Sequence, residues 1–299
     1  MRGTDSFCEY NPHVNMIFFA SAIILSIVIG HPAYLGISLF FAFSYVFIVR
    51  PRKAMKLLAR MVIVFVLISI IGPLFNDLGD TVLFRWFWGR AYTMEALVCS
   101  ATQAMMAVSV LTWFSSYSEV MTSDRFMYIF SPLAPALCLV LTMVLRLIPS
   151  YQRKARQISS CRASVGKGTE EGTRKEKITS AMTVLSALTS WALEGAVVSA
   201  DSMKSRGYGT VEKRSHFSNY RLDGRDVAAY VLILVLLSGC VYMLSSGEAS
   251  ASFFPTVELS DISSVRGRLL MIIYGLLMAV PTAINVKDKL LWRYLISGI

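Results

Sequence analysis

Apolar runs long enough to cross a lipid bilayer alternate with short polar segments along most of the chain. A spanning helix needs roughly 20 mostly apolar residues, within a usable range of about 17 to 25. The pattern therefore predicts six transmembrane helices, at 14–30, 31–49, 61–75, 96–118, 227–247 and 269–286. Only a His31-Pro32 turn separates the first two, which predicts a tight helical hairpin.

Two further apolar stretches, 126–148 and 178–200, are ambiguous by length alone, and the charge around them decides how we interpret them. Segment 150–177 carries eight Lys and Arg residues against three Glu residues, and loop 50–60 carries five basic residues and no acid. Cytoplasmic loops of membrane proteins are enriched in Lys and Arg. Both basic segments are cytoplasmic only if an even number of spans separates them, and 61–75 with 96–118 already supplies two.

We therefore expect 126–148 and 178–200 to be amphipathic helices at or below the inner membrane surface. The predicted organisation is a first group of spans in 1–125, an amphipathic cytoplasmic region in 126–226, and the last spans with a cytoplasmic tail in 227–299. Both termini are then cytoplasmic. The predicted fold class is an all-α polytopic membrane protein with about six transmembrane helices.

The composition supports this class and excludes several others. Hydrophobic residues make up 55% of the 299 residues and charged residues 16%, whereas soluble domains average roughly a quarter charged residues. A soluble enzyme, a disordered chain and a disulfide-stapled secreted scaffold all fit poorly. The net charge of +10 falls in blocks between apolar runs, so we expect a lipid bilayer rather than nucleic acid as the partner.

The cytoplasmic region is predicted to contain one long one-sided helix, from about Thr173 to Ser205. Apolar residues recur at spacings of three and four, as at Ile178, Met182 and Leu185, while Trp191 falls off this stripe. The helix would end at Arg206-Gly207, where glycine suits a left-handed cap. Such a helix could act as a lever or lie on lipid, and the pattern alone leaves both open.

Motifs for catalysis are missing from the sequence. Segment 164–169 has glycine after its lysine and lacks the earlier glycine of a phosphate-binding loop, so no ATPase is predicted on this chain. The three histidines are scattered and the five cysteines form no CxxC pair, which predicts no metal site. Ionisable residues are essentially absent from the predicted spans, which disfavours a proton relay.

Specific residues resemble a known family. The block Met203-Lys-Ser-Arg-Gly-Tyr-Gly209, preceded by Trp191-Ala-Leu-Glu194, is similar to the second conserved motif of the T component of energy-coupling factor (ECF) transporters. The segment Met143-Val-Leu-Arg-Leu-Ile-Pro149 resembles that family's helix leading into the coupling region. Further similar segments, at 11–15, 31–32, 117–124 and 221–226, extend the resemblance over most of the chain.

The resemblance implies a plasma-membrane scaffold without a catalytic site. Such a T component binds two ABC ATPase subunits and a small integral-membrane S component, which captures a vitamin or a metal ion. ATP and Mg bind to the ATPases, so no cofactor is expected on this chain. Long cytoplasmic coupling helices end in two short motifs, each docking on one ATPase, and transmit ATP-driven closure to the S component.

Carried onto this sequence, the resemblance assigns three groups of residues. The second ATPase-contacting motif is Lys204, Ser205, Arg206, Gly207, Tyr208 and Gly209, with Arg206 as its principal contact. The first motif falls at Ser164, Val165 and Gly166, where the arginine is missing and either Arg162 or Lys167 replaces it, or one ATPase docks differently. That asymmetry suits two non-identical ATPases. Arg146 and Pro149 are expected to shape the junction between the membrane-facing and cytoplasmic parts of a coupling helix.

Two alternatives come from other classes of protein. One is a membrane-embedded enzyme that uses the cytoplasmic region as its active face, although clustered catalytic side chains are missing. The other is an assembly protein that binds lipid through its amphipathic insert and transports nothing. The transported substrate is not encoded here, because the resemblance places specificity on a separate polypeptide.

Overall fold

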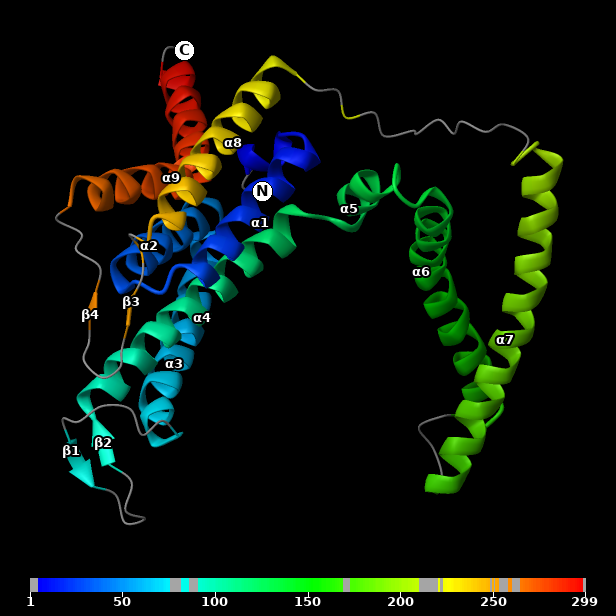
Figure 1. Ribbon diagram of the computed structural model, residues 1–299. Coiled ribbons are helices and arrows are strands. Elements are labelled where there is room, and N and C mark those ends of the chain that lie inside the picture. The colour runs from blue at the N-terminus through cyan, green and yellow to red at the C-terminus, as the bar shows by residue number, and fades with distance from the viewer. Residues whose placement is uncertain are drawn as a thin grey trace. The chain divides into compact units, whose positions relative to one another are not determined.

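The computed structural model describes residues 5–75, 82–85, 91–168, 173–209, 220, 223–247, 249, 251–252, 258–259 and 264–297. Helices account for most of the described chain (Figure 1). The chain divides into two compact units, one of Met1–Phe126 with Tyr220–Ile299 and the other of Met127–Asn219. Residues 221–222, which belong to the similar segment 221–226, lie outside the described residues.

The first unit contains the helices predicted as spans. After the 3-10 turn Ser6–Glu9, these are α1 (Pro12–Val28), α2 (Pro32–Val49), α3 (Pro51–Phe75), α4 (Met94–Val120), α8 (Gly224–Ser245) and α9 (Val265–Ser297). Two short antiparallel pairs connect helices, β1 (Val82–Arg85) with β2 (Ala91–Thr93) and β3 (Ala251–Ser252) with β4 (Glu258–Leu259). Helix α5 (Ser123–Phe130) contains the boundary between the units, and α6 (Pro135–Ser164) and α7 (Arg174–Ser205) form the second unit.

Local chemistry explains where the first two helices begin. The Asn11 side chain accepts a hydrogen bond from the His13 amide, and the His31 side chain accepts one from the Ala33 amide. Each cap is followed at the first helical position by a proline. Proline lacks a backbone N–H, and at this position the helix would leave that N–H without a hydrogen-bond partner anyway. The predicted His-Pro turn therefore ends one helix and starts the next.

Seven described helical stretches are long and apolar enough to cross a membrane: α2, Ala54–Phe75 of α3, α4, α6, α7, α8 and Val265–Trp292 of α9. This is the fold of a multi-pass helical membrane protein. Helix α1 is shorter, with 17 residues. Helix α9 is continuous through Pro281 and extends past residue 286, where the predicted span ends. Its orange and red parts run in different directions (Figure 1). Length and composition do not separate α6 and α7 from the spans.

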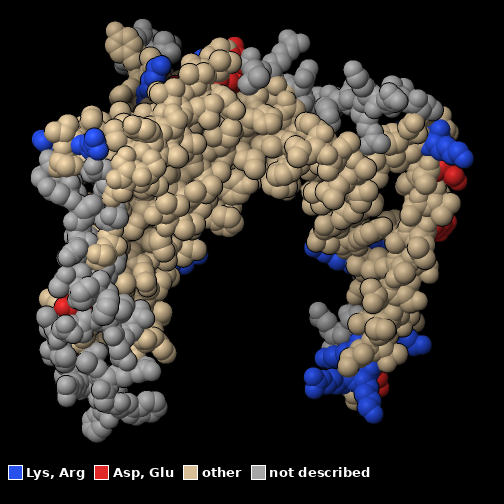
Figure 2. All heavy atoms as spheres, in the orientation of Figure 1, with Lys and Arg blue, Asp and Glu red and all other residues tan. Residues whose placement is uncertain are grey.

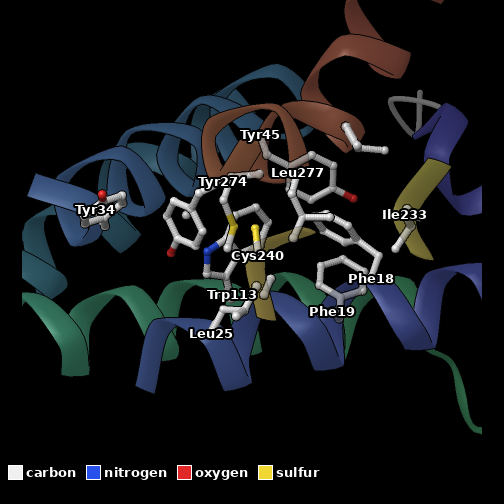
Figure 3. Packing of buried hydrophobic residues seen from close by; sticks show 14 of the residues in the cluster. Phe18, Phe19, Leu25, Tyr34, Tyr45, Trp113, Ile233, Cys240, Tyr274 and Leu277 are labelled. Carbon is white, nitrogen blue, oxygen red and sulfur yellow. The ribbon is translucent and has the colours of Figure 1, made fainter. Parts of the chain in front are cut away.

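Aromatic rings pack together in the core of the first unit (Figure 3), and serine hydroxyl groups add hydrogen bonds between its helices. Phe18 and Phe19 of α1 pack edge-on against Trp113 of α4, with ring centroids 5.6 and 6.3 Å away. The Trp113 indole donates to Ser38 Oγ of α2 at 2.9 Å, and Ser38 is 2.7 Å from Ser109 Oγ of α4. Helices in lipid gain little from the hydrophobic effect, so such close packing and interhelical hydrogen bonds stabilise the bundle.

Several helix ends meet at one end of this unit. The Asp5 carboxylate accepts hydrogen bonds from the Tyr45 hydroxyl of α2 and from the Asn285 amide of α9. Close by in the chain, Arg50 after α2 forms an ion pair with Glu119 of α4. The N-terminal segment, the C-terminal ends of α2 and α4 and the later part of α9 are thereby connected, and the predicted topology places all of them on the cytoplasmic side.

Candidate functional site

The predicted site residues fall on the antiparallel hairpin of α6 and α7. The helices lie together near the turn that connects them and separate toward their other ends (Figure 1). Tyr151 packs edge-on against Trp191 at 5.4 Å between ring centroids, and the Lys154 ammonium lies 5.7 Å from the centre of the same ring. Trp191 lies off the apolar stripe of α7 because it faces α6. The sequence pattern showed that Trp191 is off the stripe, but it did not identify Tyr151 as its partner.

Arg162 links the two helices closer to the turn. Its Nη2 donates to Ser180 Oγ of α7 at 3.0 Å, and Ser180 Oγ donates to the Lys167 carbonyl at 2.7 Å. Ser180 is buried. This chain of contacts connects α6, the turn and α7, and nothing in the sequence pattern singles out Ser180.

Helix α7 begins with a reciprocal cap. The Thr173 side chain accepts from the Glu176 backbone amide, and the Glu176 carboxylate accepts from the Thr173 amide at 2.8 Å. This backbone hydrogen bond, with a smaller contribution from the Thr173 side chain, lowers the pKa of the Glu176 carboxyl below its ordinary value. The predicted start of the helix near Thr173 is confirmed.

Helix α7 ends in a glycine-terminated Schellman cap. Arg206 is the C-cap residue, and Gly207 follows with a φ of 73°. The Gly207 amide donates to the Lys204 carbonyl at 3.0 Å, and the Tyr208 amide donates to the Met203 carbonyl at 3.0 Å. These two bonds define the motif. The predicted left-handed cap at Gly207 is confirmed.

The second motif is presented on the surface of this helix end. Lys204, Ser205, Arg206 and Tyr208 are all exposed, and the Ser205 hydroxyl donates back to its own helix, at the Ser202 carbonyl. Gly209 has a second left-handed φ, of 92°. The Arg206 guanidinium is thus available to a partner, with five N–H donors in a fixed fork that suits carboxylates.

Helix α6 ends in the same cap. Val165 is its C-cap residue and Gly166 follows with a φ of 70°. The Gly166 amide donates to the Ala163 carbonyl at 2.9 Å, and the Lys167 amide donates to the Arg162 carbonyl at 2.9 Å. Position by position, the two caps have the same hydrogen bonds. The alignment of 164–166 with 205–207 made on the sequence is matched by local geometry.

No basic residue stands at the C-cap of α6. Val165, 76% exposed, occupies the place that Arg206 has in α7. Arg162 lies three residues earlier, half-buried and bonded to Ser180. Lys167 lies two residues later and is exposed, as is Ser164. The first motif therefore has the backbone of the second without its arginine.

Arg146 and Pro149 lie inside one uninterrupted helix. Proline in a helix interior removes a backbone hydrogen bond and tends to end or kink the helix. Helix α6 is continuous through Pro149 to Ser164, and the Arg153 guanidinium donates to the Pro149 carbonyl at 3.3 Å. Arg146 is exposed on the same helix, so the apolar and basic halves of α6 belong to one continuous helix.

Basic residues gather at the turn end of the hairpin, where Figure 2 shows Lys and Arg side chains close together. Within the described ranges, no group of three or more His, Cys, Asp and Glu residues could hold a metal ion. Of the described cysteines, all five are free and Cys161 is the exposed one.

Comparison with known proteins adds no relative. No protein family matches the chain, and no curated protein matches it significantly. The resemblance to ECF T components therefore rests on the residues named for it.

Proposed function

We propose that this chain is the T component of an ECF-type ABC importer in the plasma membrane. It would be a multi-pass scaffold that binds two ATPase subunits and a small S component. ATP-driven closure of the ATPases would pass through α6 and α7 to the S component, which takes up a vitamin or a metal ion. Hydrolysis, ATP and Mg would belong to the ATPases, and this chain would need no cofactor.

The observation that carries the proposal is the pair of matching caps on one helical hairpin. Because α6 and α7 are antiparallel, their C-terminal caps lie at opposite ends of the hairpin. Helix α7 has 32 residues and is therefore about 48 Å long. Two equivalent turns held so far apart by long helices are suited to contacting two separate subunits.

The difference between the caps supports non-identical ATPases. Arg206 offers a planar cation for a bidentate contact with a carboxylate, whereas Val165 offers an exposed apolar side chain at the equivalent place. One ATPase would then bind α7 mainly through charge, and the other would bind α6 through the backbone turn and apolar contact.

The proposal also requires the hairpin and both termini to be cytoplasmic. The eight basic residues between 150 and 177 support this, because the positive-inside tendency opposes their translocation. The shared cluster of Asp5, Tyr45 and Asn285 supports an arrangement in which the N-terminal segment and the later part of α9 lie on the same side.

Co-purification tests the proposal. The tagged full chain is extracted in mild detergent from its own cells, as wild type, Arg206→Glu and Arg156→Glu. Arg156 is the matched control, because it is an exposed arginine in the C-terminal half of α6, away from both caps, and undergoes the same charge reversal. Two ABC ATPases and a small hydrophobic protein should accompany wild type and Arg156→Glu, and Arg206→Glu should lose or weaken the ATPases. A well-folded chain that purifies alone in every case contradicts the proposal.

A membrane-surface assembly protein is the second candidate. Exposed apolar residues on the hairpin, such as Met182, Leu185 and Val197, lie on the same helices as the basic cluster, a combination typical of helices that bind anionic lipid surfaces. This candidate predicts lipid binding by the chain and no ATPase in any preparation. Catalytic turnover by the chain without an ATPase would instead favour the membrane enzyme.

A further inference from the structure

Two hollows flank Arg162 at the turn of the α6–α7 hairpin. One, of about 420 Å³, is lined on the α6 side by Lys154, Gln157, Ile158, Cys161, Arg162, Val165 and Lys167. The other, of about 700 Å³, lies between the turn and α7, and its lining includes Arg162, Lys167, Lys175, Glu176 and Thr179. Arg162 and Lys167 belong to the walls of both hollows.

The Arg162 side chain is held in place by one hydrogen bond, but not all of its N–H donors have partners among the described residues. Its Nη2 donates to Ser180 Oγ, which fixes the guanidinium between the helices. Its Nε is buried and has no hydrogen-bond partner among the described residues. A buried donor left without a partner costs free energy, so the guanidinium retains donor capacity that the described contacts do not use.

The described walls of the hollows are strongly basic. They contribute four cations, Lys154, Arg162, Lys167 and Lys175, and one carboxylate, that of Glu176. The Glu176 carboxylate already accepts the Thr173 amide in the cap of α7. The first turn of α7 lines the larger hollow, and its helix dipole also favours negative charge there. Charge, donors and space all fit a phosphoryl group.

We propose that the hollows around Arg162 form a binding site for a phosphoryl group. Arg162 would hold it through the guanidinium, and Lys167 and Lys175 would neutralise its charge from the turn and from α7. The group can come from a free phosphate compound or from the headgroup of an anionic lipid. The site shares Arg162, Val165 and Lys167 with the first motif, but its test does not require an ATPase.

The test uses the full chain in nanodiscs of phosphatidylcholine, at roughly physiological salt so that diffuse charge is screened beyond about 8 Å. Inorganic pyrophosphate is titrated by calorimetry into wild type, Arg162→Gln, Lys175→Gln and Lys177→Gln. Lys177 is the matched control, since it is exposed on the same turn of α7 and is not among the residues lining either hollow. In a second arm, native mass spectrometry counts phosphatidylglycerol molecules retained by each variant in detergent.

Wild type and Lys177→Gln should bind, and loss of one charge-assisted contact should weaken binding at least about tenfold in Lys175→Gln and Arg162→Gln. Site-dependent binding of pyrophosphate identifies a soluble phosphate as the source, and site-dependent retention of phosphatidylglycerol alone identifies a lipid headgroup. Because Arg162→Gln also removes the contact to Ser180, amide hydrogen exchange of α7 checks its fold, and Lys175→Gln keeps the test decisive if that fold is lost. Binding of neither probe to wild type, or an equal loss in Lys177→Gln, overturns the proposal.

Discussion

Val165 and Arg206 occupy the same C-cap position of the same glycine-terminated turn, one at the end of α6 and the other at the end of α7. The backbone around them has matching hydrogen bonds, so the two positions differ in the side chain that they present. The two caps therefore share a backbone conformation, but only the cap of α7 has a charged side chain at the C-cap position.

Restoring that charge should strengthen the weaker end. Val165 is 76% exposed, so Val165→Arg is expected to fold normally. Under the proposed function it should raise the amount of ATPase retained through a salt wash, and it should partly rescue Arg206→Glu. Quantitative mass spectrometry of the purified complexes measures both effects. Unchanged retention in both backgrounds would show that the α6 cap is not a docking motif.

The left-handed glycine of the α6 cap should resist substitution. Gly166 has a φ of 70° and open space where an added methyl group would lie, so Gly166→Ala should cost about 1–2 kcal/mol through backbone strain alone. Gly195→Ala is the control, because Gly195 lies inside α7 with equally open space and its replacement should stabilise the helix by about 1 kcal/mol. Amide hydrogen exchange of the hairpin should show opposite changes. A gain in protection for both variants would contradict the cap.

Labelling of Cys161 should report on which side of the membrane the hairpin lies. With the other four cysteines replaced by alanine, exposed Cys161 should react with a membrane-impermeant maleimide in inside-out vesicles and not in intact cells. In a background without Cys161, Ser246→Cys at the exposed end of α8 should give the reverse result. Labelling of Cys161 in intact cells would mean that α6 crosses the membrane.

Close approach of α3 and α4 should make Gly72 hard to replace. A Cβ atom at Gly72 would lie 2.5 Å from Ser100 Oγ and 2.7 Å from Ser100 Cβ, so Gly72→Ala should destabilise the bundle by about 1–3 kcal/mol. Adding Ser100→Gly removes both clashing atoms and should recover part of the loss. Gly239→Ala, with its nearest neighbour 3.5 Å away at Ile273, should be mild. Thermal unfolding in detergent ranks the variants, and equal midpoints for Gly72→Ala and Gly239→Ala would refute the close approach.

The start of α7 should loosen in acid. The hydrogen bond from the Thr173 amide lowers the pKa of Glu176 below its ordinary value of about 4.5. A carboxyl with a lowered folded-state pKa stabilises the folded form above its unfolded pKa, and this contribution is lost as pH falls through the folded value. Hydrogen exchange in the first turns of α7, corrected for intrinsic rates, should therefore rise below about pH 4.5 in wild type. Glu176→Gln should show no such step, and a step that persists in this variant would assign it to another group.

The sequence predicted the elements that local chemistry determines. Long apolar runs indicated the helices of the first unit, and Thr173 and Gly207 marked the two ends of α7 to within a residue, because caps depend on nearby side chains. The continuity of α6 through Pro149 was not predicted. From the sequence alone, a proline predicts the end of a helix. The contact of Tyr151 with Trp191, just after Pro149, involves a residue of another helix and cannot be predicted from the residues around Pro149.

Hydrogen bonds between side chains of different helices could not be predicted from the sequence either. Ser38 stands in an apolar run, and nothing near it in the sequence names Trp113 or Ser109 as its hydrogen-bond partners. Such pairs depend on how each helix is rotated about its own axis. For the candidate site, the motif residues could be found by resemblance, but the bond from Arg162 to Ser180 and the hollows beside it required the packing of α6 on α7.

The carboxylate of Asp5 has a consequence for how the chain is made. Its partner Asn285 lies 280 residues farther along, so the contact cannot form until α9 has been translated and inserted. Until then, of its two described side-chain partners, Asp5 can bond only to Tyr45 of α2. Contacts of such high sequence separation form slowly, so the bond between Asp5 and Asn285 forms late in the assembly of the bundle.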